Sequence, residues 1–279
     1  MSISPHYRFR DRTEAGRLLA TKLHFLSDRP DVVVLGLPRG GVPVAYEIAR
    51  ILHVPLDICL VRKLGVPGQE ELAMGAIAQS GVRVLNQELV DRLHISKQTI
   101  AAVTMQEQRE LERRHHAYRG EAAPNDAFSS QVADSTIILV DDGIATGATL
   151  MAAIAILKRH QPARLVVAVP VAPPSVCRQL HRLVDQVICL VTPQKLSAIG
   201  CWYHDFSQVS DQEVQTLLQR AQMDRLRVAR EIKQPPPMPV ENETAAMPPA
   251  ENPTGSETAD RSPLGSPNPS ETPPHGHHK

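Results

Sequence analysis

Short apolar runs rich in β-branched residues alternate with amphipathic segments along most of this 279-residue chain, and this alternation is what most constrains its fold. Strands separated by single helices imply a mostly parallel sheet with helices on both faces. We therefore expect an α/β fold with a doubly wound sheet, in which ligands bind beyond the carboxyl ends of the strands. The predicted strands are 32–36, 56–61, 137–140, 165–170 and 186–191, and the predicted helices are 42–52, 148–160 and 174–183.

Two further segments interrupt this alternation. The pattern predicts a β-hairpin from 73–78 and 82–85, and a long, highly charged helix at 95–118. The Glu, Arg and His side chains of that helix are typical of a solvated face or of a contact between two copies of the chain. We therefore expect a helical insertion, and a homodimer that uses it.

The composition changes sharply near Lys233. Half of the 24 prolines follow this residue, together with Ser, Thr, Glu and Asn, and no Phe, Tyr or Trp occurs there. Such a segment buries too little apolar surface to offset the entropy lost on ordering it. We predict a folded unit over residues 1–233 and a disordered, Pro-, Ser- and Glu-rich tail over residues 234–279.

The charge balance points to a small ligand. The chain has 30 basic and 30 acidic residues, and the predicted tail holds two of the basic and six of the acidic ones, which leaves the rest at +4. A charge this small is consistent with an anionic small ligand and gives no reason to expect nucleic acid as a partner.

The cysteines and the N-terminal residues indicate the cellular compartment in which the protein is expected. Four cysteines lie far apart in the sequence, which suggests neither a disulfide framework nor a zinc site, so we expect them to be reduced. No signal-peptide-like stretch opens the sequence, and no window approaches the roughly 18 consecutive apolar residues of a membrane span. We expect a cytoplasmic protein with no membrane partner.

The segment 137–149, IILVDDGIATGAT, carries the most specific chemical signal. Asp141 and Asp142 end an apolar strand, where two carboxylates can accept hydrogen bonds from neighbouring ribose hydroxyls. Small residues then allow the backbone to approach an anion at the N-terminus of a helix. These residues are Ala145, Thr146, Gly147, Ala148 and Thr149. The alternative, a turn that only caps a helix, leaves the paired carboxylates unexplained, and the glycine spacing fits neither a Walker loop nor a dinucleotide fingerprint.

Two other strand ends carry cationic groups. Arg39 and Gly40 follow the first predicted strand, where a glycine exposes backbone N–H groups and the guanidinium adds a fork of donors. Lys63, with Arg62 beside it, follows the second predicted strand and precedes residues 66–72, which we predict to be a mobile loop that closes over a ligand. An ordinary strand-helix turn and a basic pair on an edge strand are the alternatives for these two elements.

Residues 137–149 resemble the 5-phosphoribosyl 1-pyrophosphate (PRPP) motif of type I phosphoribosyltransferases, and the resemblance extends over the strand-helix order of about residues 31–210. It implies that Asp141 and Asp142 bind the ribose 2- and 3-hydroxyls and that residues 145–149 surround the 5-phosphate. It also implies that Arg39 and Gly40 receive pyrophosphate, often through a strained or cis peptide, and that Lys63 contacts it.

The resemblance implies an enzyme of nucleotide metabolism in which a nitrogenous base displaces pyrophosphate from PRPP. Lys63, Arg39, Asp141 and Asp142 are the catalytic candidates. Mg²⁺, held mainly by PRPP itself, would neutralise charge on the leaving group. After the last strand, the family places an aromatic residue over the base and an acid near Mg²⁺. Trp202 or Tyr203 and Asp205 match these roles, and an ordinary core aromatic patch is the alternative.

The acceptor is less well defined. Hypoxanthine- and guanine-type relatives carry a carboxylate where this chain has Ala145, which disfavours a 6-oxopurine acceptor that uses that carboxylate. Adenine-type relatives place a glutamate on the mobile loop, where Glu70 or Glu71 could serve. Gly143 also departs from the larger residue common after the acid pair. A PRPP-sensing regulatory protein of the same fold without transferase activity is the alternative function, and a purely structural or interaction protein is a third.

Overall fold

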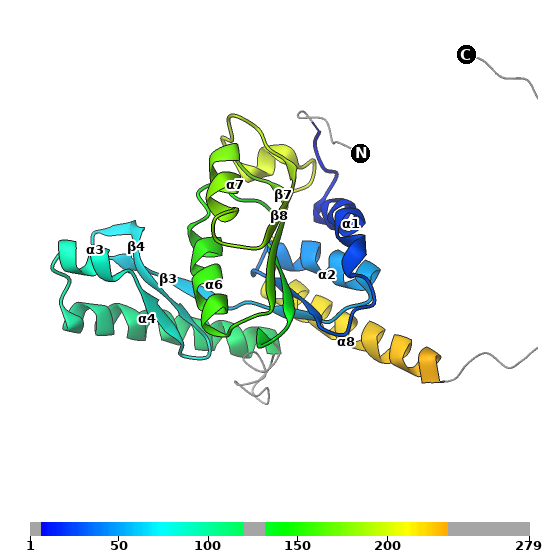
Figure 1. Ribbon diagram of the computed structural model, residues 1–279, viewed down its shortest axis with the longest axis horizontal. Coiled ribbons are helices and arrows are strands. Elements are labelled where there is room, and N and C mark those ends of the chain that lie inside the picture. The colour runs from blue at the N-terminus through cyan, green and yellow to red at the C-terminus, as the bar shows by residue number, and fades with distance from the viewer. Residues whose placement is uncertain (1–6, 120–131, 234–279) are drawn as a thin grey trace, which may run out of the picture. The chain divides into compact units, whose positions relative to one another are not determined.

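The computed structural model describes residues 7–119 and 132–233, and its centre is a five-stranded sheet in the order β2-β1-β6-β7-β8 (Figure 1). All four strand pairings in this sheet are parallel, which confirms the predicted doubly wound α/β class. The predicted tail, residues 234–279, lies outside the described residues. The strands are β1 (Val32–Gly36), β2 (Leu56–Ile58), β6 (Thr136–Val140), β7 (Arg164–Val171) and β8 (Gln186–Val191).

Helices cover both faces of this sheet because its central strands are apolar on both faces. Every residue of β1 and of β6 is buried. Val34 and Ile138 pack with α1 and α2, whereas Leu35 and Leu139 pack with α6 and α7, as the two-residue period of a strand requires. The four helices are α1 (Arg12–Leu23), α2 (Gly41–Leu52), α6 (Ala148–Arg159) and α7 (Pro174–Leu180), and the short helix η1 (His24–Leu26) follows α1.

A second, antiparallel sheet corrects part of the sequence-based prediction. It consists of β3 (Val61–Val66), β4 (Gln69–Ala78) and β5 (Arg83–Leu85). The mobile loop predicted at 66–72 is therefore wrong for most of its length, because the chain forms a β-hairpin whose turn is only Pro67 and Gly68. Gly68 has φ +77°, which suits glycine in a tight turn. The predicted strand 56–61 is likewise split, since β2 ends at Ile58 and Val61 already belongs to β3.

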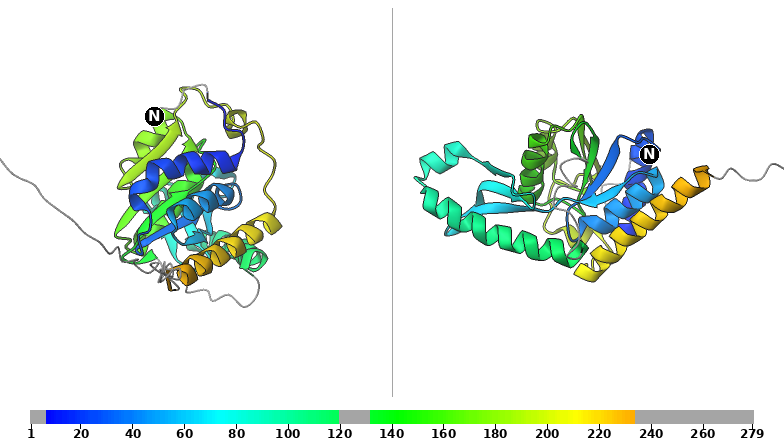
Figure 2. Two further views of the ribbon diagram at one scale, coloured as in Figure 1. Left: turned by 90° about the vertical axis from the view of Figure 1, so that its right-hand side faces the viewer. Right: turned by 90° about the horizontal axis from the view of Figure 1, so that it is seen from below.

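Three further α-helices lie outside the two layers that cover the parallel sheet. They are α3 (Gln87–Arg92), α4 (Lys97–Arg119) and α8 (Asp211–Lys233). Helix α4 confirms the predicted charged helix: Ile100, Leu111 and Tyr118 are buried in a cluster with residues of β3, β4 and α8, and most of its charged side chains remain outside. Seen from below, α4 and α8 meet under the parallel sheet (Figure 2). Among the described residues, none of the helices is both long and apolar enough to cross a membrane.

Candidate functional site

The loops after β1 and β6 form one edge of the parallel sheet. The two strands are neighbours, and Leu37 N–H donates to the Val140 carbonyl at 2.9 Å. A Cβ on Gly40 would lie 1.8 Å from Asp142 Oδ2, and a Cβ on Gly41 would lie 2.9 Å from Asp141 Cα. The acid pair therefore packs directly against the glycines of the other loop. Two elements that were predicted separately, Arg39-Gly40 and Asp141-Asp142, belong to one site.

The loop after β1 has an unusual backbone. The peptide bond between Pro38 and Arg39 is cis, which is rare before a residue other than proline and agrees with the feature that the family resemblance implied. The Arg39 guanidinium lies 3.8 Å from Asp211, at the start of α8. Asp211 also accepts a hydrogen bond from the Tyr118 hydroxyl at 3.2 Å. Sequence reasoning missed this acidic neighbour of Arg39, because it lies in a helix that was not predicted.

The loop from Ala145 to Thr149 leads into α6 as expected. Its anchor is Ile144, whose N–H donates to the Val171 carbonyl at 2.9 Å. Gly147 has φ +79° and is the N-cap of α6, so it offers no side-chain acceptor to the first amides of the helix. Ala145, Thr146 and Thr149 are exposed. A helix N-terminus with available amides and exposed hydroxyls is suited to an anion such as a phosphate.

Electrostatics distinguish the two carboxyls of the acid pair. Burial, followed by the neighbouring Asp142, raises the pKa of Asp141 well above its usual range. Burial also raises the pKa of Asp142, but Arg12 opposes this shift. Arg12 Nε lies 2.8 Å from Asp142 Oδ2, and both side chains are almost buried. At neutral pH the pair therefore favours a charge on Asp142 over a charge on Asp141.

A residue that follows β8 fixes the main chain of the acid pair. Tyr203 is only 1% exposed, packs against the rings of Phe9 and Phe206, and donates its hydroxyl hydrogen to the Asp142 carbonyl at 2.6 Å. The prediction that Tyr203 stacks on a base is therefore wrong, because its ring is enclosed by other side chains. The alternative, a core aromatic patch, is confirmed for this residue.

The two other residues predicted after β8 are more accessible. Trp202, at the end of the short helix η2 (Ile199–Trp202), is half-buried and remains the candidate aromatic for an acceptor. Asp205 is exposed, and a hydrogen bond from the Ser207 N–H lowers the pKa of its carboxyl. Its predicted role near Mg²⁺ stays a prediction.

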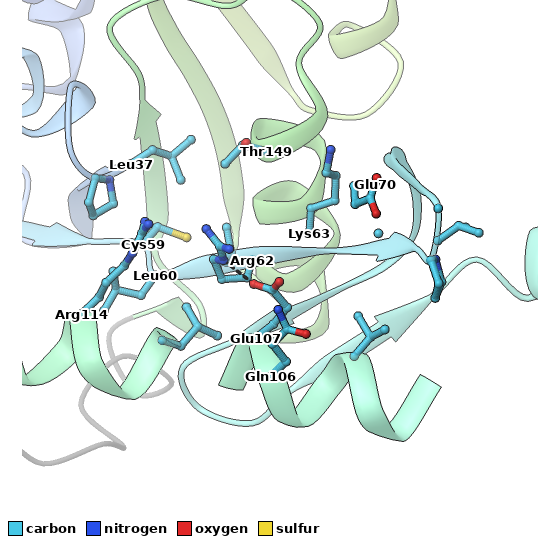
Figure 3. A pocket seen from close by; sticks show the side chains of 18 residues that line it. Leu37, Cys59, Leu60, Arg62, Lys63, Glu70, Gln106, Glu107, Arg114 and Thr149 are labelled. Carbon is cyan, nitrogen blue, oxygen red and sulfur yellow. Dashed lines mark hydrogen bonds and ion pairs between the residues drawn. The ribbon is translucent and has the colours of Figure 1, made fainter. Parts of the chain in front are cut away.

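A cavity of about 670 Å³ adjoins this edge, and Pro38, Lys63 and Thr149 line it, one from each predicted loop. In Figure 3, Lys63 and Thr149 lie above β3, and Glu107 of α4 lies below it. Arg62 also lines the cavity, and its Nε pairs with Glu107 Oε2 at 2.5 Å. Glu70 belongs to the lining too, whereas the side chain of Glu71 lies outside the described part of the structure.

The sequence-based prediction missed Arg12 because nothing nearby marks it. It is one of three arginines in the stretch RFRDR, 130 residues before Asp142, and no recognised motif includes it. Its partner Phe206, whose ring centroid is 3.9 Å from Arg12 Cζ, lies almost 200 residues further on. Only the folded chain brings these residues together.

Comparisons with known proteins agree with this geometry. A model of the phosphoribosyl transferase domain matches residues 11–201. A Mycobacterium tuberculosis protein that is provisionally named a phosphoribosyl transferase is 45% identical over 216 residues, which are 77% of this chain and 47% of that protein. The same match is found in a second strain. This chain thus spans about half the length of the curated relatives that it matches.

A solved structure gives the same result for the fold. The crystal structure of the protein TT1426 from Thermus thermophilus has a TM-score of 0.65 and 39% sequence identity to this chain. The similarity covers 76% of this chain and 98% of that one. Since the family model matches more than half of the sequence, the chain belongs to the phosphoribosyl transferase domain family.

Proposed function

We propose that the protein is a PRPP-dependent phosphoribosyltransferase in which a nitrogenous base displaces pyrophosphate from PRPP. The observation that carries the proposal is the packing of Gly40 and Gly41 against the acid pair Asp142 and Asp141. This packing supports the proposal because the two loops that would bind ribose and pyrophosphate are in direct contact.

The proposed reaction breaks the bond between the anomeric carbon and the pyrophosphate oxygen and forms a carbon–nitrogen bond, and the nitrogen loses its proton. Asp141 and Asp142 would hold the ribose hydroxyls, and the amides and hydroxyls of residues 145–149 would hold the 5-phosphate. Arg39 and Lys63 would stabilise the negative charge that builds on the leaving group. Catalysis would then rest on orientation and on fixed charges, and no covalent intermediate with the protein is required.

Mg²⁺ belongs to the proposal as a partner of PRPP. The described residues contain no group of three or more His, Cys, Asp or Glu side chains that could hold a metal ion. Asp142 is already engaged by Arg12, and Asp141 Oδ1 accepts from the Asp142 N–H at 2.9 Å. These residues suit an ion whose ligands are mainly PRPP oxygens and water, as is common for Mg²⁺ bound with phosphates. Such an ion would supply charge neutralisation on the pyrophosphate.

The acceptor is proposed only as a class. Ala145 is exposed on the phosphate loop and carries no carboxylate. A 6-oxopurine acceptor would therefore lack the acid that hypoxanthine- and guanine-type relatives have at the position of Ala145. Trp202 and Phe206 both follow β8 and are partly exposed, but the Phe206 ring already stacks with the Arg12 guanidinium, so Trp202 is the candidate aromatic for the acceptor. We propose a nitrogenous base that binds on this side of the ribose, and a homodimer that associates through α4.

Calorimetry with PRPP and Mg²⁺ tests the binding half of the proposal, and absence of binding to the folded wild-type protein would overturn it. Pyrophosphate release across a panel of purine and pyrimidine bases tests the transfer half. Release with one base supports the transferase. Tight PRPP binding with no release from any base would favour a PRPP-sensing regulator of the same fold.

A further inference from the structure

We infer that Arg12 is a positioning residue for the proposed transfer: its guanidinium holds the Asp142 carboxylate in the orientation that a ribose hydroxyl needs. The inference rests on the proposed function, and it adds a residue that lies outside the three loops of the site. Arg12 is the first residue of α1, and its side chain contacts Asp142 just after the end of β6.

Four contacts fix the Arg12 and Asp142 pair. Arg12 Nε donates to Asp142 Oδ2 at 2.8 Å, and Arg12 Nη1 donates to the Ser207 carbonyl at 2.8 Å. The guanidinium also stacks on the ring of Phe206 with 3.9 Å between Cζ and the ring centroid. The Tyr203 hydroxyl holds the main chain of Asp142 at 2.6 Å. A guanidinium held at three points is a fixed charge, and a fixed charge can select one rotamer of its carboxylate partner.

The position of the Asp142 carboxylate leaves little freedom. Its Oδ2 atom sits between Arg12 and the α-carbon of Gly40, where a Cβ would come within 1.8 Å of it. The side chains of Arg12 and Asp142 are 11% and 12% exposed, so solvent screens the pair only weakly. With Oδ2 engaged by Arg12, Oδ1 is the oxygen left to accept from a ribose hydroxyl.

Charge provides a readout that a merely structural role would not affect. The ionisable groups near Asp142 are Arg12, which lowers the pKa of Asp142, and Asp141 and Tyr203, which are coupled to it electrostatically. Burial raises the pKa of Asp142. Removal of the guanidinium therefore raises that pKa further, and the protonated form persists to higher pH. If PRPP binds only when Asp142 is ionised, the loss of PRPP affinity at acidic pH must begin at a higher pH in the variant without the guanidinium than in the wild type.

The test compares Arg12→Gln with Arg17→Gln. Arg17 lies on the same helix and pairs with Glu47 at 3.0 Å, and Glu47 keeps Arg50 as a second partner at 2.8 Å, so Arg17→Gln controls for the loss of a cation from α1. Calorimetry with PRPP and Mg²⁺ between about pH 5.5 and about pH 9 should show Arg12→Gln binding about tenfold or more weakly at pH 7, since one charge-assisted hydrogen bond has that effect. The deficit should shrink as pH rises. Arg17→Gln should match the wild type at every pH.

Arg12→Lys separates charge from geometry. It keeps the positive charge and loses the planar fork, so its acidic limb should stay near that of the wild type while its affinity is reduced. Equal weakening of Arg12→Gln at all pH values, or an acidic limb identical to that of the wild type, would overturn the inference. Failure of the wild type to bind PRPP would instead overturn the proposed function.

The inference can also be tested without PRPP, by measuring the pKa of Asp142 directly. Carboxyl-carbon NMR titration of Asp142 should show a higher pKa in Arg12→Gln than in the wild type, and an unchanged pKa would contradict the inference. If Arg12→Gln fails to fold, Phe206→Leu provides the comparison, and Arg12→Lys is the control that keeps the charge. Phe206→Leu removes the ring under the guanidinium, should shift the Asp142 pKa upward by less, and must shift it in the same direction.

Discussion

The sheet edge that carries the acid pair and the hairpin β3–β4 differ in how tightly they are packed. At the sheet edge, a Cβ on Gly40 would collide with Asp142, whereas a Cβ on Gly68 in the hairpin turn would meet nothing within 4 Å. All residues of β1 and β6 are buried, and residues 67–70 are all exposed. The hairpin projects from the parallel sheet in Figure 1. The difference indicates that the acid-pair side of the proposed site is built by the core, whereas the Lys63 side includes an exposed hairpin.

The largest effect is expected from Asp141→Asn combined with Asp142→Asn. Asp142 would lose a charge-assisted hydrogen bond to a ribose hydroxyl, at about 1.5–3 kcal/mol, and Asp141 would lose a second hydrogen bond at about 1 kcal/mol, so PRPP affinity should fall roughly 100-fold. Calorimetry with PRPP and Mg²⁺ measures the change. Asp31→Asn is a matched control, because Asp31 is a partly exposed carboxylate that pairs with Arg29 at 2.6 Å. Retained binding in the double variant would show that the core-built edge is not the ribose site.

Gly40→Ala compared with Gly68→Ala tests the packing difference itself. The new methyl at position 40 meets Asp142 Oδ2, and Arg12 restrains that carboxylate from moving away. Overpacking of this kind costs about 1–3 kcal/mol of unfolding free energy, and PRPP affinity should fall about tenfold. Gly68→Ala should cost about 1 kcal/mol through its positive φ alone and should lower PRPP affinity less than Gly40→Ala does. Urea titration and calorimetry give the two quantities, and similar PRPP affinities in the two variants would remove the distinction between the two regions.

Lys63→Met tests the side of the proposed site that the β3–β4 hairpin forms. Lys63 lies on β3 and lines the cavity with Pro38 and Thr149. A cation that stabilises developing charge on pyrophosphate contributes mainly to the transfer step, so the rate of pyrophosphate release should fall about 10- to 100-fold. Unfolding free energy should change by less than about 0.5 kcal/mol, because the side chain is partly exposed. Lys97→Met, on an exposed position of α4, is the control. An unaffected rate would exclude Lys63 from the leaving-group side.

The same difference explains what the sequence could predict. The parallel sheet was predictable because its strands are mostly apolar. The loop that carries the acid pair was predictable because strand, carboxylates, small residues and helix are contiguous in 137–149. The proximity of Arg39-Gly40 to that segment followed from the rule that parallel strands end at one edge. The local sequence pattern and this rule together were sufficient to predict that these two loops lie at the same sheet edge.

The hairpin was not predictable in the same way. Gly65 packs against the backbone of Glu70, and the register of β3 with β4 shifts on both sides of Gly65, which breaks the two-residue alternation that marks a strand. Exposed polar residues around Pro67 and Gly68 then resemble a loop. The sequence also gave no indication of contacts between distant segments, such as the packing of Phe9, near the start of the chain, against Tyr203.

The smallest expected effect is on the unfolding free energy and comes from the carboxyl group of Asp141. Because the pKa of Asp141 is raised in the folded state, the unfolded chain releases its proton at a lower pH than the folded chain does. The contribution of Asp141 to stability is therefore lost as pH rises from about 4 through its folded pKa. Asp141→Asn removes this titration, so at pH 7 it should be as stable as the wild type or about 1 kcal/mol more stable.

Urea titrations of both proteins at pH 5 and pH 8 measure this difference. The stability advantage of Asp141→Asn should be greater at pH 8, and Asp31→Asn should show no such advantage, since the pKa of Asp31 is lowered by its hydrogen bond from Arg29. An Asp141→Asn variant that is less stable at pH 8 than at pH 5, relative to the wild type, would mean that the ionised carboxylate is stabilised in the fold. A variant that gains stability while it loses PRPP affinity would indicate that the core keeps Asp141 for binding at a cost in stability.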